Sequence, residues 1–414
     1  MPLNIAVVGC CHGELPKIYE RLGSCHGKIK SKVDLLIICG DFQAIRNTYD
    51  LDSLAVPTKY RKLGYFGEYY TGKRKARVPT IFIGGNHESS SFMTELYLGG
   101  WVCPDIYYMG HSGVVQFNGL RIGGISGVYY ESDYNKGKFN SHFELPPYTH
   151  SSLRSVYHTR HYDYLKLKQI EQPLDIFISH DWPRGIEHHG NVKSLIKRKP
   201  FFKDEINTNT LGNPVTIKLL DHLQPNHWFS GHLHVRYQVN YKHPLDLERT
   251  KELLNYQMDL PVDPNDPEAS NPDEVVVNLD SGDSEHESEG ALPSAQTHSS
   301  TEATATTPKV LTKNPDELDI ETSQPTVLPD MTNIRKWPRL RSPTNYTGVT
   351  KFLALDKCGV RREYLEVTRL KNKQTPAVFT YDPEWLAITR AMQQYMPTEV
   401  YDTKDYPPKD ELKK

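Results

Sequence analysis

The sequence lacks the features that would place it in a membrane or in an oxidising compartment. No apolar run approaches the roughly 20 residues of a membrane-spanning helix, and Met1 to Asn4 lead directly into an apolar segment with no secretory leader. The 6 cysteines show no framework spacing along 414 residues, which fits a reducing compartment where thiols stay free. We therefore expect a cytosolic or nuclear protein with no membrane partner.

Aromatic residues are absent from one long segment. Residues 259–330 contain no Phe, Trp or Tyr and are rich in Ser, Thr, Pro, Asp and Glu, so they cannot bury enough apolar surface to offset the cost of ordering. This segment holds 17 acidic residues against Lys309 and Lys313, a net charge of −15, whereas the whole chain carries −2, which leaves +13 for the rest. A basic body indicates an acidic partner, most commonly nucleic acid; a merely solvated surface is the alternative.

Five short apolar segments each end beside residue types that bind metals. The segments are residues 3–8, 33–39, 79–83, 174–178 and 227–230. Runs of this kind fill buried sheets, with helical spacing between them at residues 14–22, and ligands collect at the carboxyl ends of such strands. After the last run, His232 and His234 alternate along a segment that we expect to be extended, so that both would share one face.

Together these strand ends supply thiol, imidazole, carboxylate and amide groups. The candidate metal ligands are Cys10, His12, Asp41, Asn86, His180, His232 and His234. Borderline transition metals accept such ligands, and a shared carboxylate can hold two ions about 3.5–4 Å apart, an arrangement suited to phosphoester hydrolysis. Each residue alone has a structural alternative, such as a helix cap or a hydrogen-bonded core histidine; the ordered set favours a metal site.

The ordered motifs resemble those of the calcineurin-like metallophosphoesterase superfamily. They are Gly9-Cys10-Cys11-His12-Gly13, Gly40-Asp41, Gly85-Asn86-His87-Glu88, His180 and Gly231-His232-Leu233-His234. Cys10 stands where that superfamily usually has aspartate. This departure, together with Ser179 to Pro183 and Phe352 to Cys358, resembles the RNA lariat debranching enzymes. The resemblance implies an α/β fold with a metallophosphoesterase β-sandwich core and flanking helices, and a nuclear location with possible shuttling to the cytoplasm.

The resemblance and the composition divide the chain into three parts. Residues 1–243 are the expected catalytic domain, 244–343 a disordered acidic linker, and 344–414 a C-terminal segment that completes and packs on the core. The linker is also a candidate binding segment for protein partners.

The resemblance also implies a role for each candidate ligand. Asp41 would bridge two metals, completed on one side by Asn86, His180 and His232, and on the other by His12, His234 and Cys10. The family is associated with Fe2+, Zn2+ and Mn2+, and we expect one or two ions per chain. Two alternatives stay open: Cys10 either binds metal or only lines the site, and His87 is either the general acid or a residue that orients Asn86.

Aromatic and cationic residues are interleaved between residues 127 and 160. By resemblance this segment is the recognition loop for branched (lariat) RNA, and the candidate substrate-binding residues are Tyr129, Tyr134, Lys136, Arg154, Tyr157 and His158. Such residues can stack on splayed bases while holding phosphates, although a tyrosine-rich surface loop has the same composition. A second basic tract, residues 191–203, is either a phosphate contact or a solvated helix face.

The predicted function is hydrolysis of the 2′-5′ phosphodiester at an intron branch point, by metal-bound hydroxide with a histidine general acid, giving linear RNA. Another metallophosphoesterase is the alternative, either a phosphodiesterase or a protein Ser/Thr phosphatase. The phosphatases continue Gly-Asp with x-x-Asp-Arg-Gly, whereas Phe42 and Gln43 follow Asp41 here. A non-catalytic scaffold of the same fold is a third hypothesis. The complete set of candidate ligands argues against it.

Overall fold

The computed structural model of the chain describes residues 2–25, 32–136, 144, 146–243, 348–371 and 378–396. All of them belong to one compact unit, built from residues 1–255 and 330–414. The predicted linker at 244–343 lies outside the described residues, as do residues 137–143 of the predicted recognition loop and residues 397–414. The domain boundaries therefore stay a prediction.

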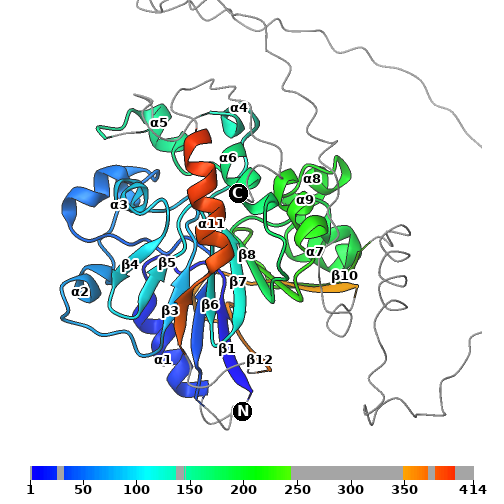
Figure 1. Cartoon of the computed structure of the whole chain (residues 1–414), viewed down its shortest axis with the longest axis horizontal. Helices are drawn as coiled ribbons and strands as arrows, with labels where there is room; N and C mark the ends of the chain where they lie inside the picture. Colours follow the sequence, from blue (N-terminus) through cyan, green and yellow to red (C-terminus); the bar gives the residue numbers. More distant parts are fainter. Residues whose placement is uncertain are drawn as a thin grey trace, which may run out of the picture. The chain divides into compact units, whose positions relative to one another are not determined.

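Two β-sheets form the centre of the unit (Figure 1). The six-stranded sheet has the order β12 (Leu365–Leu370), β1 (Leu3–Val8), β2 (Leu35–Ile38), β3 (Thr80–Phe82), β5 (Ile106–Tyr108) and β4 (Gly100–Cys103). The seven-stranded sheet has the order β10 (Tyr237–Lys242), β11 (Val349–Ala354), β9 (His227–Ser230), β8 (Ile176–Ser179), β7 (Leu120–Ile125), β6 (Ser112–Phe117) and β13 (Phe379–Tyr381). These two sheets, which share an apolar cluster, confirm the predicted β-sandwich core.

Alternation along the strands explains why the sheets pack face to face. In β1, Ile5 and Val7 join an apolar cluster with Ile122 and Ile178 of the other sheet, while Val8 packs in the cluster on the outer face with helix α1 (Leu15–Cys25). Because side chains alternate between the two faces of a strand, a strand covered on both faces is buried along its whole length and mostly apolar. Every residue of β1 is accordingly buried.

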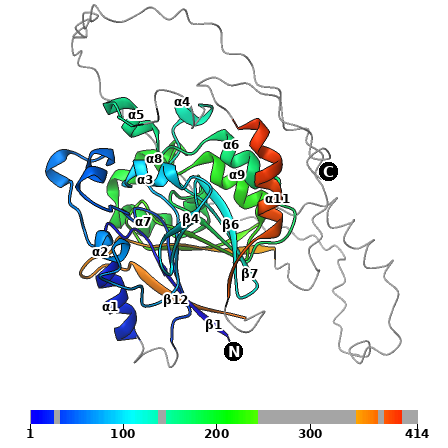
Figure 2. The ribbon, with the colours of Figure 1, turned by 60° about the vertical axis from the view of Figure 1, so that its left-hand side comes forward.

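Helices cover the outer faces of both sheets. Those nearest the six-stranded sheet are α1 (Leu15–Cys25), α2 (Phe66–Tyr70) and α3 (Ser90–Glu95) (Figure 1). Those on the side of the seven-stranded sheet include α6 (His161–Lys168), α7 (Val192–Arg198), α8 (Lys203–Asn207), α9 (Pro214–Leu223) and α11 (Pro383–Met392), which Figure 2 shows from a second direction. The remaining helical elements are α4 (Glu131–Tyr134), α5 (His150–Ser155) and the 3-10 turns η1 (Thr48–Ser53), η2 (Thr58–Tyr60), η3 (Ile186–His189), η4 (Pro200–Phe202) and η7 (Gln393–Tyr395). No helix in the described ranges has the length and apolar character needed to cross a bilayer.

The C-terminal strands pair with strands that precede residue 243. β12 runs antiparallel to β1 with Leu3 opposite Leu370, β11 lies between β9 and β10, and β13 pairs with β6. We expected these strands to finish one sheet, whereas they divide between two. Since β1 and β9 lead into the predicted ligands, this pairing fixes the strands that carry the site.

Candidate metal centre

The loops that follow β1 and β2 are hydrogen-bonded to each other. The amide of His12 donates to the carbonyl of Asp41 at 2.6 Å, and the amide of Gly13 donates to the carbonyl of Phe42 at 3.2 Å. His12 and Asp41 both adopt left-handed backbone conformations, with φ of 49° and 47°. Non-glycine residues held in this region cluster at functional sites. The mutual hydrogen bonds fix the two side chains relative to each other.

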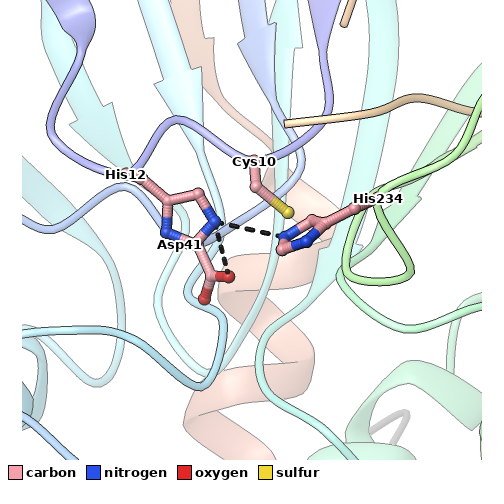
Figure 3. Close-up of side chains that lie close together, drawn as sticks. All are labelled: Cys10, His12, Asp41 and His234. Atoms are coloured by element: carbon pink, nitrogen blue, oxygen red, sulfur yellow. Dashed lines mark hydrogen bonds and ion pairs between the residues drawn. The ribbon is translucent and has the colours of Figure 1, made fainter. Parts of the chain in front are cut away.

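Four predicted ligands form one cluster (Figure 3). Ligand atoms of Cys10, His12, Asp41 and His234 all lie within 4.8 Å of one another. The Nε2 of His12 is 3.2 Å from the Nε2 of His234 and 3.6 Å from the Oδ2 of Asp41. Thiol, two imidazoles and a carboxylate are a suitable donor set for Zn2+ or Fe2+.

His180 and Asn86 meet the other oxygen of Asp41. The Nε2 of His180 lies 3.4 Å from the Oδ1 of Asp41 and 3.2 Å from the Oδ1 of Asn86. The Nδ1 of His180 is 2.7 Å from the carbonyl oxygen of Cys39, which can only accept, so this nitrogen carries the proton. In neutral His180 the Nε2 therefore directs a lone pair at two oxygen atoms. A cation between these three acceptors would relieve their repulsion.

His232 lies beside His180, with ring centroids 4.9 Å apart, and its backbone amide donates to the Sγ of Cys10 at 3.1 Å. The expectation of an extended segment here was wrong. His232 and His234 have φ of 62° and 50°, and residues 231–235 form no strand. The tight turn lets His234 reach the first cluster while His232 lies against His180, so Asp41 stands between two groups of ligands, as the bridging role requires.

The charges of the site suit a cation. Burial disfavours the charge of Asp41, but the neighbouring histidines, His180 and His12 foremost, outweigh it and hold the pKa of the carboxyl below its usual range. Burial lowers the pKa of His180 to about 4 and that of His234 to about 3, so both rings are neutral ligands at pH 7. Burial, and then the charge of Asp41, raises the pKa of the Cys10 thiol, so this thiol needs a nearby cation to ionise.

His87 lies next to the cluster without belonging to it. Its amide donates to the Oδ1 of Asp41 at 2.9 Å, and its ring centroid is 5.6 Å from that of His12. Its Nδ1 is buried and has no hydrogen-bond partner among the described residues. The position of His87 is thus fixed by its backbone amide, and its Nδ1 is not committed to a hydrogen bond within the described residues.

Glu88 has a structural role in the site that we did not predict from the sequence. Its carboxyl group accepts hydrogen bonds from the amides of Phe42, Gln43 and Gly85 at 2.7, 2.8 and 3.0 Å. Burial, and then the charge of Asp41, raises the pKa of this carboxyl to about 8. Glu88 joins the loop after β2 to the loop after β3. Its place in the Gly85-Asn86-His87-Glu88 motif was the feature of the sequence that could have indicated this role.

The candidate substrate-binding residues fall into two groups. His158 is buried and its Nδ1 lies 2.6 Å from the Oδ2 of Asp133, and Lys136 also pairs with Asp133, so both are engaged inside the loop. Arg154 is exposed and Tyr129, Tyr134 and Tyr157 are half-buried. Tyr130, which was not among the candidates, is 55% exposed and stacks on His158 with centroids 5.1 Å apart. Tyr130 therefore offers a more accessible aromatic face than His158, and the substrate-binding set stays a prediction.

Comparisons with known proteins agree with this geometry. A family model for calcineurin-like phosphoesterases matches residues 3–236, and one for the lariat debranching enzyme C-terminal domain matches residues 347–414. The chain is 39% identical to the lariat debranching enzyme of Schizosaccharomyces pombe over 398 residues, which cover 95% of this chain and 79% of that protein.

Vertebrate relatives match a shorter part. Lariat debranching enzyme A of Xenopus laevis and the lariat debranching enzyme of Homo sapiens are each 55% identical over 241 residues, or 58% of this chain. The matched part spans 44% of the length of each of those two proteins. On the fold, the two family matches and the yeast relative, the chain belongs to the lariat debranching enzymes within the calcineurin-like phosphoesterases.

Proposed function

We propose that the chain hydrolyses the 2′-5′ phosphodiester bond at the branch point of lariat RNA and releases linear RNA. The observation that carries the proposal is the cluster of Cys10, His12, Asp41 and His234, in a chain that aligns over 95% of its length with a lariat debranching enzyme. The +13 charge outside residues 259–330 suits an RNA substrate. The nucleus, where introns are excised, is the proposed location, with shuttling to the cytoplasm.

The ligand geometry supports one or two divalent ions, with Fe2+, Zn2+ and Mn2+ as candidates. Cys10, His12 and His234 would hold one ion, Asn86, His180 and His232 the other, and Asp41 would contact both. When bound, such ions neutralise phosphate charge and lower the pKa of a water molecule, so that hydroxide is available at neutral pH. A thiol at Cys10 in place of a carboxylate favours softer ions over Mg2+.

The proton for the departing 2′ oxygen would come from His87. Its ring lies 5.6 Å from the ring of His12, so it borders the place where a phosphate would sit. The backbone bond from His87 to Asp41 holds this position whether or not the ring is protonated. A positioned acid of this kind contributes about 10²–10⁴-fold to rate.

The loop beside the site would hold the branch. Tyr130 stacks on His158, and Tyr157 packs edge-on against His158 with centroids 4.8 Å apart. Tyr157 also lines a small cavity with Gly85, next to the loop that carries Asn86. This aromatic group is suited to stacking on unpaired bases at a branch point.

One experiment tests the proposal directly. Purified protein loaded with Mn2+, Fe2+ or Zn2+ is given an RNA that contains one 2′-5′ branch among 3′-5′ linkages, and the products are sized. We expect the branch alone to open, while the His189→Ala variant, which removes an exposed histidine that is not one of the candidate ligands, behaves like the wild type. Equal cleavage of both linkages would reject the specificity, and hydrolysis of phosphoserine peptides instead would favour the phosphatase alternative.

A further inference from the structure

Residues 355–358 pass directly over the metal-binding cluster. Lys357 forms an isolated parallel bridge with Cys10, and the amide of Cys358 donates to the carbonyl of Cys10 at 3.0 Å. The approach is so close that a Cβ on Gly9 would lie 2.3 Å from the carbonyl oxygen of Asp356. This C-terminal segment is therefore a wall of the site, although it is far from Cys10 in sequence.

The pairing determines where the side chain of Lys357 points. Residues opposite each other in a β-bridge project to the same face, and Cys10 directs its Sγ into the cluster (Figure 3). The Lys357 side chain is only half-buried, so its ammonium group remains open to a ligand.

Lys357 belongs to a group of three cations with one carboxylate: Lys357, Lys199, Arg362 and Asp356. Asp356 pairs with Arg362 at 2.8 Å, whereas Lys357 and Lys199 have no carboxylate within ion-pair distance among the described residues. Lys199 is half-buried at the end of α7. Burial lowers the pKa of its ammonium group, the charge of Asp356 raises it, and the charges of Arg362 and Lys357 lower it further. Its ammonium also lies 5.6 Å from the ring centroid of Phe201, which is 70% exposed.

This arrangement decides between the two interpretations of the basic tract 191–203. Lys193 and Lys197 are exposed on α7 and fit a solvated helix face. Lys199 instead is half-buried and feels the charges of Asp356, Arg362 and Lys357, and Phe201 supplies an aromatic face beside it. Unpaired cations next to an exposed aromatic ring are the features that hold a single nucleic-acid strand.

We propose that Lys357 and Lys199 bind consecutive phosphates of one RNA arm as it leaves the metal-binding cluster, with Lys357 nearest the reacting phosphate. The proposal rests on the proposed function, since it assigns the path of one strand of the branched substrate. Charge complementarity and continuity with the ligand cluster argue for RNA as the occupant. Phe201 stacks on a base of the same arm.

The test compares Lys357→Gln and Lys199→Gln with two matched controls in the full chain. Lys351→Gln removes an exposed lysine from β11, the strand that precedes Lys357, and Lys197→Gln removes one from the same helix end as Lys199. We expect K357Q to lower kcat/KM on branched RNA by about ten- to a hundredfold, the range for losing a hydrogen bond to a charged group. K199Q loses less, both controls stay within about twofold, and K357R recovers most of the activity.

Two further readouts separate phosphate binding from a structural role. Metal content and melting temperature of K357Q match the wild type. The slope of log(kcat/KM) against log[salt] becomes shallower by about 0.7, as for one lost phosphate contact on a single strand. Binding is measured by fluorescence anisotropy on branched RNA in the slowly cleaving His87→Ala background, with and without K357Q.

The outcomes distinguish the two proposals. Cleavage and binding that are equal in K357Q and K351Q overturn the strand path and leave the debranching function intact. A wild-type protein that cleaves no branched RNA, while binding still depends on Lys357, overturns the function and retains the strand path. Loss of metal or of melting temperature in K357Q, with no rescue by K357R, makes Lys357 a structural residue and rejects the proposal.

Discussion

Replacing Gly85 by alanine is predicted to abolish the metal centre without unfolding the protein. An added Cβ at this position would lie 2.3 Å from the Oδ1 and 2.7 Å from the backbone nitrogen of Asp41, and 2.6 Å from the Nε2 of His180. Carbon and oxygen atoms approach comfortably to about 3.3 Å, so the carboxylate must move by about 1 Å. A displacement of about 1 Å at a reacting centre can cost a hundredfold in rate.

The neighbouring glycine provides the control. A Cβ on Gly84 would meet its nearest atoms, on Ser126 and Tyr108, at 3.5 Å, which is ordinary contact. Gly84→Ala also restricts the unfolded chain, so we expect its stability to be unchanged or slightly raised. The two variants differ by one position in the same loop and by the direction of a single methyl group.

Three measurements decide this prediction: bound metal by mass spectrometry, melting temperature, and turnover of branched RNA. We expect Gly85→Ala to lose metal and at least a hundredfold in turnover, with a small change in melting temperature, and Gly84→Ala to behave like the wild type. A Gly85→Ala protein with full metal content and turnover would refute the assignment of Asp41 and His180 to one ion-binding group.

Three further predictions concern other parts of the molecule. His87→Ala should keep its metal and lose about a hundredfold or more in turnover; unchanged turnover would remove His87 from the mechanism. Glu144→Ala breaks an ion pair with Arg160 in which both side chains are at most 2% exposed, and should cost about 3–5 kcal/mol in urea unfolding. Glu68→Ala breaks the exposed pair with Arg74 and should cost below about 1 kcal/mol. Equal losses would contradict the buried placement of Glu144. Deleting residues 259–330, which hold none of the candidate ligands, should leave turnover within about threefold, and loss of turnover would give the segment a functional task.

The strands, and the candidate ligands that follow them, could be predicted because both depend on local sequence pattern. Residues 3–8 were expected as a strand and form β1, and the expected helix at 14–22 is α1, Leu15–Cys25. The carboxyl ends of neighbouring parallel strands meet at one edge, so Cys10, His12 and Asp41 follow from the runs that precede them. Their proximity needed no knowledge of loop shape.

The turn at residues 231–235 was predicted wrongly because its conformation is set by distant contacts. His232 and His234 alternate as a strand would require, yet both have positive φ. The amide of His232 is held by the thiol of Cys10, a partner more than 200 residues away. Local propensity cannot register a hydrogen bond of that separation.

The position of Lys357 beside the ligand cluster also could not be predicted from the sequence pattern. Nothing in Phe352 to Cys358 indicates which strand this segment will join. The pairing of Lys357 with Cys10 follows from β11 entering beside β9 and β12 beside β1. Only the assembled sheets bring this lysine to the ligands.

The central claim is that these strand ends hold metal ions at the phosphate of an RNA branch. The most direct measurement is an anomalous-scattering map from crystals of the metal-loaded protein with branched RNA bound. We predict peaks among Cys10, His12, Asp41 and His234, and between Asp41 and His180, with the 2′-5′ phosphate beside them. Peaks elsewhere, or a branch bound away from these residues, would contradict the claim.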